Sequence, residues 1–78
     1  MQVHVRYFAV LRERKGCSDE AVTLTGPITV GALYASLFPP TESGVLPVMY
    51  AVNEAYVPED HPIAAGDEVA FIPPLGGG

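Results

Sequence analysis

Apolar and polar side chains alternate at the beginning of the chain. In residues 2–8 the odd positions are apolar and would share one face of a strand, whereas Phe8 would lie on the opposite face. The same alternation in residues 20–25 places Val22 and Leu24 on one side. Both segments are therefore predicted strands, each with one face toward a core.

Three later segments also favour strands. Residues 48–52 form an apolar run, and a turn at 53–55 leads into a short strand at 56–57. A second turn precedes the last strand, which we predict over residues 68–72.

Two segments carry helical signals. Residues 9–15 read as a short helix with a basic outer face, which Gly16 ends. Thr29 can cap a second helix over residues 30–37, because apolar residues recur there at intervals of three and four. The prolines that follow would end this helix.

The order strand, strand, helix, strand, short strand, strand matches the β-grasp, the ubiquitin-like architecture. One amphipathic helix would pack across one face of a mixed sheet, with the first and last strands paired in parallel at its centre. We therefore predict an α+β protein with a β-grasp domain over residues 1–73 and a flexible C-terminal Gly tail over residues 74–78.

Charges are segregated along the chain. Residues 1–15 hold all four cations and one carboxylate, a balance of +3, while residues 16–78 hold eight carboxylates and no cation. The net charge of −5 disfavours a nucleic-acid partner and suits a basic protein. We expect no membrane span, since every apolar run is far shorter than ~20 residues. The lone cysteine and the lack of a recognisable signal peptide predict a cytoplasmic location.

Catalytic and metal-binding patterns are nearly absent. His4 and His61 are more simply surface histidines than ligands, and the pair Asp60-His61 is too isolated for a metal site. The acidic residues after Cys17 would not activate its thiol. We expect the chain to bind no metal or cofactor and to have no active site of its own.

The glycines Gly76, Gly77 and Gly78 close the sequence, one residue after a stiff proline pair. Because glycine has no Cβ, such a tail can pass through a channel too narrow for side chains and deliver its terminal carboxylate to a distant site. The candidate reactive group is therefore the carboxylate of Gly78. The competing interpretation is a frayed end or an expression scar without a role.

Side-chain parity predicts a docking surface beside this tail. In the last strand Val69 and Phe71 would face the helix, which leaves Ala70 and Ile72 on the open face with Phe8. Together with Tyr56 they would form an exposed apolar patch. Scattered apolar surface residues are also common, but the proximity of the tail favours docking.

Several motifs resemble the small subunit of molybdopterin synthase. Residues 7–13 (YFAVLRE) followed by Gly16 are similar to the FAxLRExxG opening of that family, and residues 66–74 (GDEVAFIPP) are similar to its end before the terminal glycines. The motifs at residues 51–53 (AVN) and 60–62 (DHP) lie between them. The likeness covers nearly the whole chain and is weakest in the helix and the loop after it.

The resemblance implies a sulfur carrier. In that family a ubiquitin-activating-type adenylyltransferase uses ATP to adenylate the terminal glycine, here Gly78, and sulfur then replaces AMP to give a thiocarboxylate. The carrier inserts its tail into the large subunit of molybdopterin synthase, where the sulfur builds the dithiolene of molybdopterin for the molybdenum cofactor.

The resemblance also implies a partner interface. By position Phe8, Tyr56 and Ile72 match family residues that pack on the large subunit, and Pro74 and Leu75 would extend this interface toward the tail. A heterotetramer with the large subunit is expected.

Three alternatives stay open. The extra Gly76 resembles the thiazole-forming sulfur carrier of thiamine synthesis. A ubiquitin-like protein modifier would use the same fold and tail, with its C-terminus conjugated to lysines. A purely structural binding module would make no use of the glycines.

Overall fold

A computed structural model describes residues 1–39 and 47–74 of the chain. Its elements, in chain order, are β1 (Gln2–Tyr7), α1 (Val10–Lys15), β2 (Asp19–Thr23), α2 (Val30–Leu37), β3 (Met49–Val52), β4 (Ala55–Val57) and β5 (Glu68–Ile72). The predicted β-grasp is confirmed, and each predicted element is present. No helix in the described part of the chain is long and apolar enough to cross a membrane.

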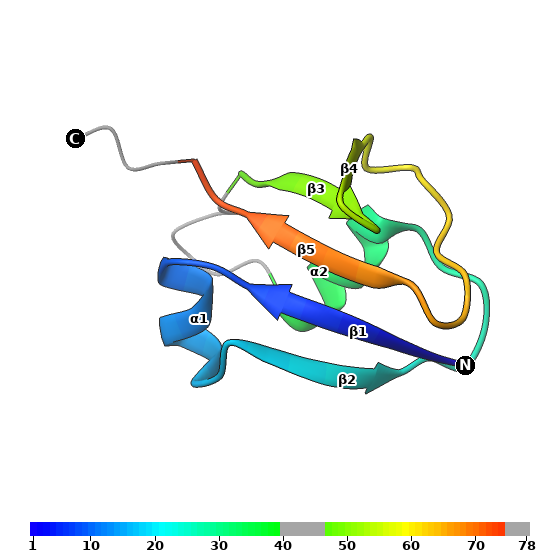
Figure 1. Cartoon of the computed structure of the whole chain (residues 1–78), viewed down its shortest axis with the longest axis horizontal. Helices are drawn as coiled ribbons and strands as arrows, with labels where there is room; N and C mark the ends of the chain where they lie inside the picture. Colours follow the sequence, from blue (N-terminus) through cyan, green and yellow to red (C-terminus); the bar gives the residue numbers. More distant parts are fainter. Residues whose placement is uncertain (40–46, 75–78) are drawn as a thin grey trace.

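The strands form one mixed sheet in the order β2-β1-β5-β3-β4. β1 and β5 pair in parallel, whereas the other neighbours are antiparallel. β5 is therefore the middle strand, and it points toward the end of the molecule where α1 lies (Figure 1). α2 packs behind the sheet in this view, so the opposite face is left open.

The core lies between α2 and one face of the sheet. Alternate residues of β1 and β5 are buried, as their sequence alternation predicts. The fully buried Phe71 of β5 meets Tyr34 of α2 with ring centroids 5.1 Å apart. The Tyr7 hydroxyl donates a 2.6 Å hydrogen bond to Glu20, and burial, followed by this bond, raises the pKa of Tyr7. Burial of these rings between sheet and helix holds the two layers together.

The start of α2 is tied to the loop that precedes β5. Thr29 caps the helix as predicted, since its Oγ1 accepts a 3.2 Å hydrogen bond from the Ala32 N–H. The N–H groups of Val30 and Gly31 donate to carbonyls of that loop, at His61 and Glu59. These bonds satisfy donors that the first helical turn leaves free.

Element boundaries differ slightly from the sequence prediction. β1 ends at Tyr7 rather than Phe8, and α1 begins at Val10 rather than Ala9, because the backbone of Ala9 has a positive φ of 51° with a ψ of −126°, which neither element accepts. β2 covers residues 19–23 rather than 20–25, since its end is set by pairing with the start of β1. The proposed domain limit at residue 73 stays a prediction.

Candidate functional site

A row of four residues crosses the open face of the sheet. Arg6 of β1 is paired with Ala70 of β5, Ala70 with Ala51 of β3, and Ala51 with Tyr56 of β4. The two alanines in the middle of the row are small, whereas the residues at its ends are large. The row therefore has a low centre, which forms the floor of a hollow of about 210 Å³.

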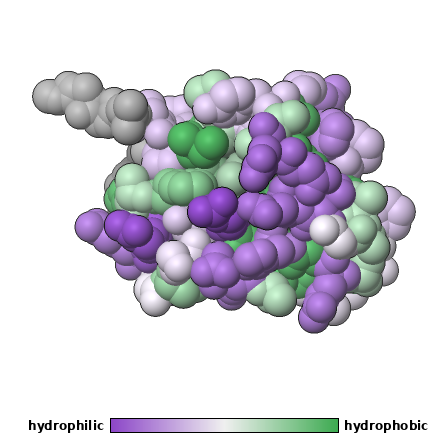
Figure 2. Space-filling model, in the orientation of Figure 1, coloured by the Kyte–Doolittle hydropathy of each residue, from purple (hydrophilic) through white to green (hydrophobic). Residues whose placement is uncertain are grey.

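We call this depression the sheet-face hollow. It is lined by Arg6, Phe8, Ala51, Glu54, Tyr56, Glu68, Ala70 and Ile72. Figure 2 shows apolar surface gathered on this face toward the end of β5, with hydrophilic side chains to the right and below. The hollow is smaller than most small-molecule sites, so it suits a side chain of a docked protein better than a small molecule.

Three predicted interface residues meet at the hollow. Tyr56 is 67% exposed and Phe8 is 37% exposed, while Ile72 is half-buried. Large apolar groups exposed side by side are typical of protein interaction surfaces. Their role in binding a partner stays a prediction.

Of the remaining predicted site residues, only Pro74 is described, and it does not line the hollow. Pro74 is exposed just beyond β5, and Pro73 before it is buried. Leu75 and the three glycines Gly76, Gly77 and Gly78 lie outside the described residues. β5 nevertheless carries the chain past the hollow at Ile72, so the segment that follows starts beside it.

A turn fixes the backbone after Phe8. The Leu11 N–H donates to the Phe8 carbonyl at 3.1 Å across Ala9, whose φ of 51° and ψ of −126° are unusual for a residue with a side chain. The Arg6 guanidinium lies 5.4 Å from the centroid of the Phe8 ring. This cation–π contact supports Phe8 from the side of β1.

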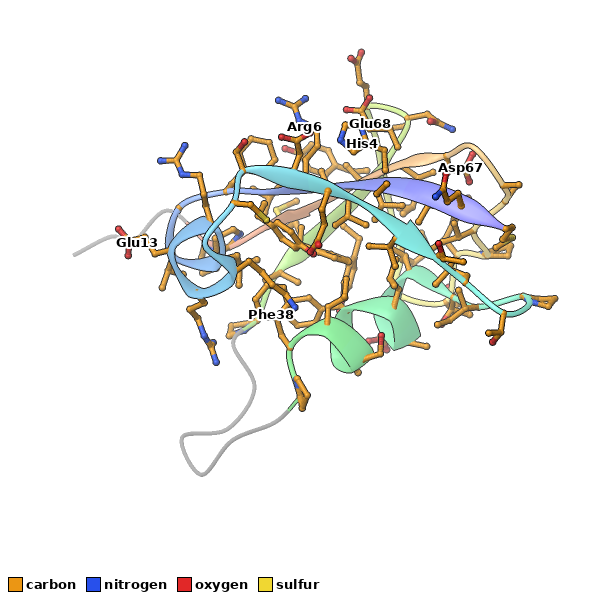
Figure 3. The ribbon with its side chains drawn as sticks, turned by 90° about the horizontal axis from the view of Figure 1, so that it is seen from below. His4, Arg6, Glu13, Phe38, Asp67 and Glu68 are labelled. Carbon is orange, nitrogen blue, oxygen red and sulfur yellow. The ribbon has the colours of Figure 1, made fainter. Side chains whose placement is uncertain are left out.

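Charged residues form one rim of the hollow. Arg6 Nη1 lies 3.3 Å from Glu68 Oε1, and both side chains are exposed, so this pair contributes little stability. Figure 3 labels both side chains, with His4 nearby, on the side of the sheet away from α2. Glu54 lines the hollow too, and its carboxylate has no hydrogen-bond or ion-pair partner among the described residues.

Other titratable groups lie outside the hollow and contact other parts of the fold. His4 Nε2 and Asp19 Oδ2 are 2.6 Å apart, and this bond, followed by one from Ser18, lowers the pKa of Asp19. Cys17 is half-buried against the core. Residues 1–39 and 47–74 contain no group of three or more potential metal ligands.

Sequence reasoning placed Ala70 on the open face but missed Ala51, the other floor residue, and the charged rim of the hollow. Ala51 is only 7% exposed yet faces away from α2, and its pairing with Tyr56 reveals this. A two-residue turn after Val52 would have given the same pairing from the sequence. The positions of Arg6 and Glu54 at the hollow needed the full register of the sheet.

Two relatives match the chain over its length. The molybdopterin synthase sulfur carrier subunit of Chlamydomonas reinhardtii is 37% identical over 83 residues, which cover 100% of both chains. The corresponding subunit of Escherichia coli (strain K12) is 37% identical over 81 residues, which cover 97% of this chain and 99% of the relative.

Solved structures share the fold. SAMP1 of Haloferax volcanii, small archaeal modifier protein 1, has a TM-score of 0.76 at 29% identity, with 100% of both chains covered. A chain in the complex of subunits 1 and 2 of molybdopterin-converting factor from Helicobacter pylori 26695 has a TM-score of 0.65, with 100% of both chains covered. At 22% identity, this second likeness concerns the fold alone.

The family comparison covers almost the same residues as the fold. The model of the ThiS family matches residues 5–78, which include every described element in full except the start of β1. Together with 37% identity to two sulfur carrier subunits, this match shows that the chain belongs to the ThiS family.

Proposed function

We propose that this chain is the sulfur carrier subunit of a molybdopterin synthase and acts in molybdenum cofactor biosynthesis. The observation that carries the proposal is 37% identity, over 100% and 97% of this chain, to two proteins of that name. The β-grasp fold and the glycines at the end of the sequence are consistent with it.

The reactive group in this proposal is the carboxylate of Gly78. A carboxylate is ionised at neutral pH and reacts poorly with nucleophiles. Attack of its oxygen on the α-phosphate of ATP, with release of pyrophosphate, would give an acyl-adenylate. A sulfur nucleophile would then displace AMP and leave a thiocarboxylate. Gly76 and Gly77 would carry this group into the partner, and no side chain of the carrier would act as catalyst.

Two protein partners follow from the proposal. A ubiquitin-activating-type adenylyltransferase would bind the ATP, so the carrier itself needs no cofactor. The large synthase subunit would cover the sheet-face hollow, with Phe8, Tyr56 and Ile72 buried and with Pro74 and Leu75 at the entrance of the tail. Two carriers and two large subunits would form a heterotetramer.

Mass spectrometry tests the chemical step. After incubation with ATP, a sulfur donor and the adenylyltransferase, the intact mass should rise by the difference between one sulfur and one oxygen atom. Deletion of Gly78 should abolish this change, whereas Gly26→Ala, at an open turn with no atom within 4 Å of the added methyl group, should keep it. Sulfur transfer by the truncated chain would refute the proposal.

Substitution at the hollow tests the partner. Phe8→Asp would bury an unpaired charge and should weaken the complex with the large subunit by at least about tenfold. Val10→Asp is the matched control, because Val10 is 41% exposed but does not line the hollow. Equal affinities of the two variants would place the interface elsewhere.

A protein modifier is the second candidate function. The likeness to small archaeal modifier protein 1, at 29% identity and a TM-score of 0.76, favours it specifically. Conjugation would join the Gly78 carbonyl to a lysine amine of a target protein. Peptides with a glycine remnant on lysine, found in cells and lost when Gly78 is deleted, would establish this activity.

Preferential binding to a thiazole synthase would instead favour the thiamine pathway.

A further inference from the structure

The turn between β3 and β4 contains a strained residue. Asn53 and Glu54 connect the paired residues Val52 and Ala55, and their φ angles are 51° and 69°. A two-residue hairpin link with two positive φ angles suits asparagine at the first position and glycine at the second. Glutamate at the second position therefore costs free energy that glycine would avoid.

Contacts inside the fold compensate for the strain at Asn53 but not at Glu54. The Asn53 amide donates to Asp67 Oδ1 at 3.0 Å and accepts the Glu68 N–H at 3.0 Å. The Glu54 carboxylate, in contrast, makes no hydrogen bond or ion pair within the described parts of the chain. A strained residue without an internal role indicates a function outside the fold.

The position of Glu54 suggests what that function is. Glu54 lines the sheet-face hollow together with the floor residue Ala51 and the exposed Tyr56. The other carboxylate at the hollow, Glu68, is already paired with Arg6, which also lies against the Phe8 ring. Glu54 therefore supplies the unpaired charge of this surface, and that charge is negative.

We infer that Glu54 is a specificity-determining docking residue, whose carboxylate binds a lysine or arginine side chain of the large subunit that covers the sheet-face hollow. This inference rests on the proposed function. A partner that covers the hollow takes water away from Glu54, and an uncompensated carboxylate would then oppose binding. A cation on the partner removes this penalty and also disfavours proteins that present an acidic or neutral surface there.

Three variants of Glu54 separate the effect of its charge from the effect of its backbone strain. Glu54→Gly removes both the charge and the strain, Glu54→Gln removes the charge alone, and Glu54→Lys reverses it. Asp60→Lys is the matched control, because Asp60 is an exposed carboxylate away from the hollow and gives the same change in net charge. The measurement is the Kd for the large subunit of the same organism, by isothermal titration calorimetry at low and high salt.

The expected result is a loss of affinity that follows charge. Glu54→Lys should raise the Kd by about tenfold or more at low salt, with a smaller effect at high salt, and Glu54→Gln should lie between it and the unchanged chain. Asp60→Lys should stay within about twofold. Glu54→Gly should bind more weakly although it unfolds at a higher urea concentration, a combination that a purely structural role of Glu54 cannot produce.

Two negative outcomes have different meanings. If the unchanged chain binds the large subunit and Glu54→Lys binds equally well, the inference about Glu54 is overturned while the proposed function stands. If the unchanged chain does not bind the large subunit at all, both fail. A substitution that alters only self-association, measured by sedimentation, would assign Glu54 to a contact between copies of this chain and would also overturn the inference.

Discussion

The side chain of Asn53 joins two parts of the sheet that are distant in the sequence. Its amide bonds to Asp67 and to the backbone of Glu68 at the start of β5, and the Asn53 N–H donates to the Glu68 carbonyl at 2.8 Å. Asparagine also tolerates the left-handed backbone that the turn requires. One residue therefore supplies both the turn conformation and the link to the middle strand.

Substitution at Asn53 should separate these two contributions. Asn53→Ala loses both side-chain hydrogen bonds and strains the turn, so we expect it to lower the free energy of unfolding by about 2–4 kcal/mol. Asn53→Gly loses the bonds but fits the backbone, and should cost about 1 kcal/mol less than alanine. Urea denaturation measures both values. Equal losses would show that the left-handed conformation is not strained.

Asp67 makes stability depend on pH. Its Oδ2 accepts the Ala64 N–H at 2.8 Å, and this bond, followed by the one from Asn53, lowers the pKa of Asp67. A carboxyl with a lower pKa in the folded state stabilises the fold above the pKa of the unfolded chain. This contribution is lost as the pH falls through the lower, folded-state pKa.

Asp67→Asn should therefore flatten the loss of stability below about pH 4. Denaturation midpoints measured at a series of pH values would reveal the change. Asp60→Asn is a suitable control, because the Asp60 carboxylate accepts no hydrogen bond from residues 1–39 or 47–74. A profile that Asp67→Asn leaves as steep as before would contradict the assignment.

At the scale of elements, helix α2 lies so close to the loop before β5 that a side chain at Gly31 would clash with the loop. A Cβ at Gly31 would lie 2.9 Å from the Glu59 carbonyl oxygen and 3.0 Å from the Glu59 Cβ. The Gly31 N–H donates to that same carbonyl at 2.8 Å, so the contact cannot open without loss of the bond. The glycine is required by packing, although it weakens the helix by itself.

Gly31→Ala should consequently lower the free energy of unfolding by about 1–3 kcal/mol, although alanine is the better helix former. Gly26→Ala introduces a methyl group with no atom within 4 Å and should stay within about 0.5 kcal/mol of the unchanged chain. Thermal or urea denaturation compares them. A stabilised Gly31→Ala variant would mean that the loop moves away at little cost.

A substitution on the floor of the sheet-face hollow can test the binding of the large subunit without disturbing the core. Ala70→Phe would fill the hollow from the middle strand and should weaken large-subunit binding by about tenfold or more, since a docked side chain loses its place. Its stability should change by less than about 1 kcal/mol, because the new ring faces away from α2. Ala21→Phe, on exposed β2 outside the hollow, should leave the Kd unchanged. If the unchanged chain and both variants bind the large subunit equally well, the hollow is not part of the interface.

Local sequence periodicity was sufficient to predict the elements but not their detailed edges. One face of β1 and of β5 is buried, so alternation marks both strands, and the spacing of three and four marks α2. Strand ends depend on the partner strand, as β2 shows. The dipeptide Asn53-Glu54 lacks the glycine that signals a tight hairpin, so the left-handed Glu54 could not be predicted.

At the scale of the whole molecule, parity predicted the apolar patch because it requires only that α2 cover one face of the sheet. Phe8 and Ile72 follow from that single condition. The hollow itself depends on the pairing of β5 with β3, which joins Ala70 to Ala51 across a long stretch of chain. Parity places Ala70 on the open face, but its neighbour Ala51 and the depression between larger side chains became visible only with the complete sheet.

The central place of β5 also governs how the protein responds to mechanical force. β1 and β5 are parallel neighbours, and the first residue of one and the last residue of the other lie at opposite ends of the sheet (Figure 1). Tension between the two ends of the chain would shear these strands along their length, so that the bonds between them stretch together instead of opening one after another. An enzyme that unfolds the protein by pulling on the segment after Ile72 must therefore extract β5, the strand that is paired on both sides.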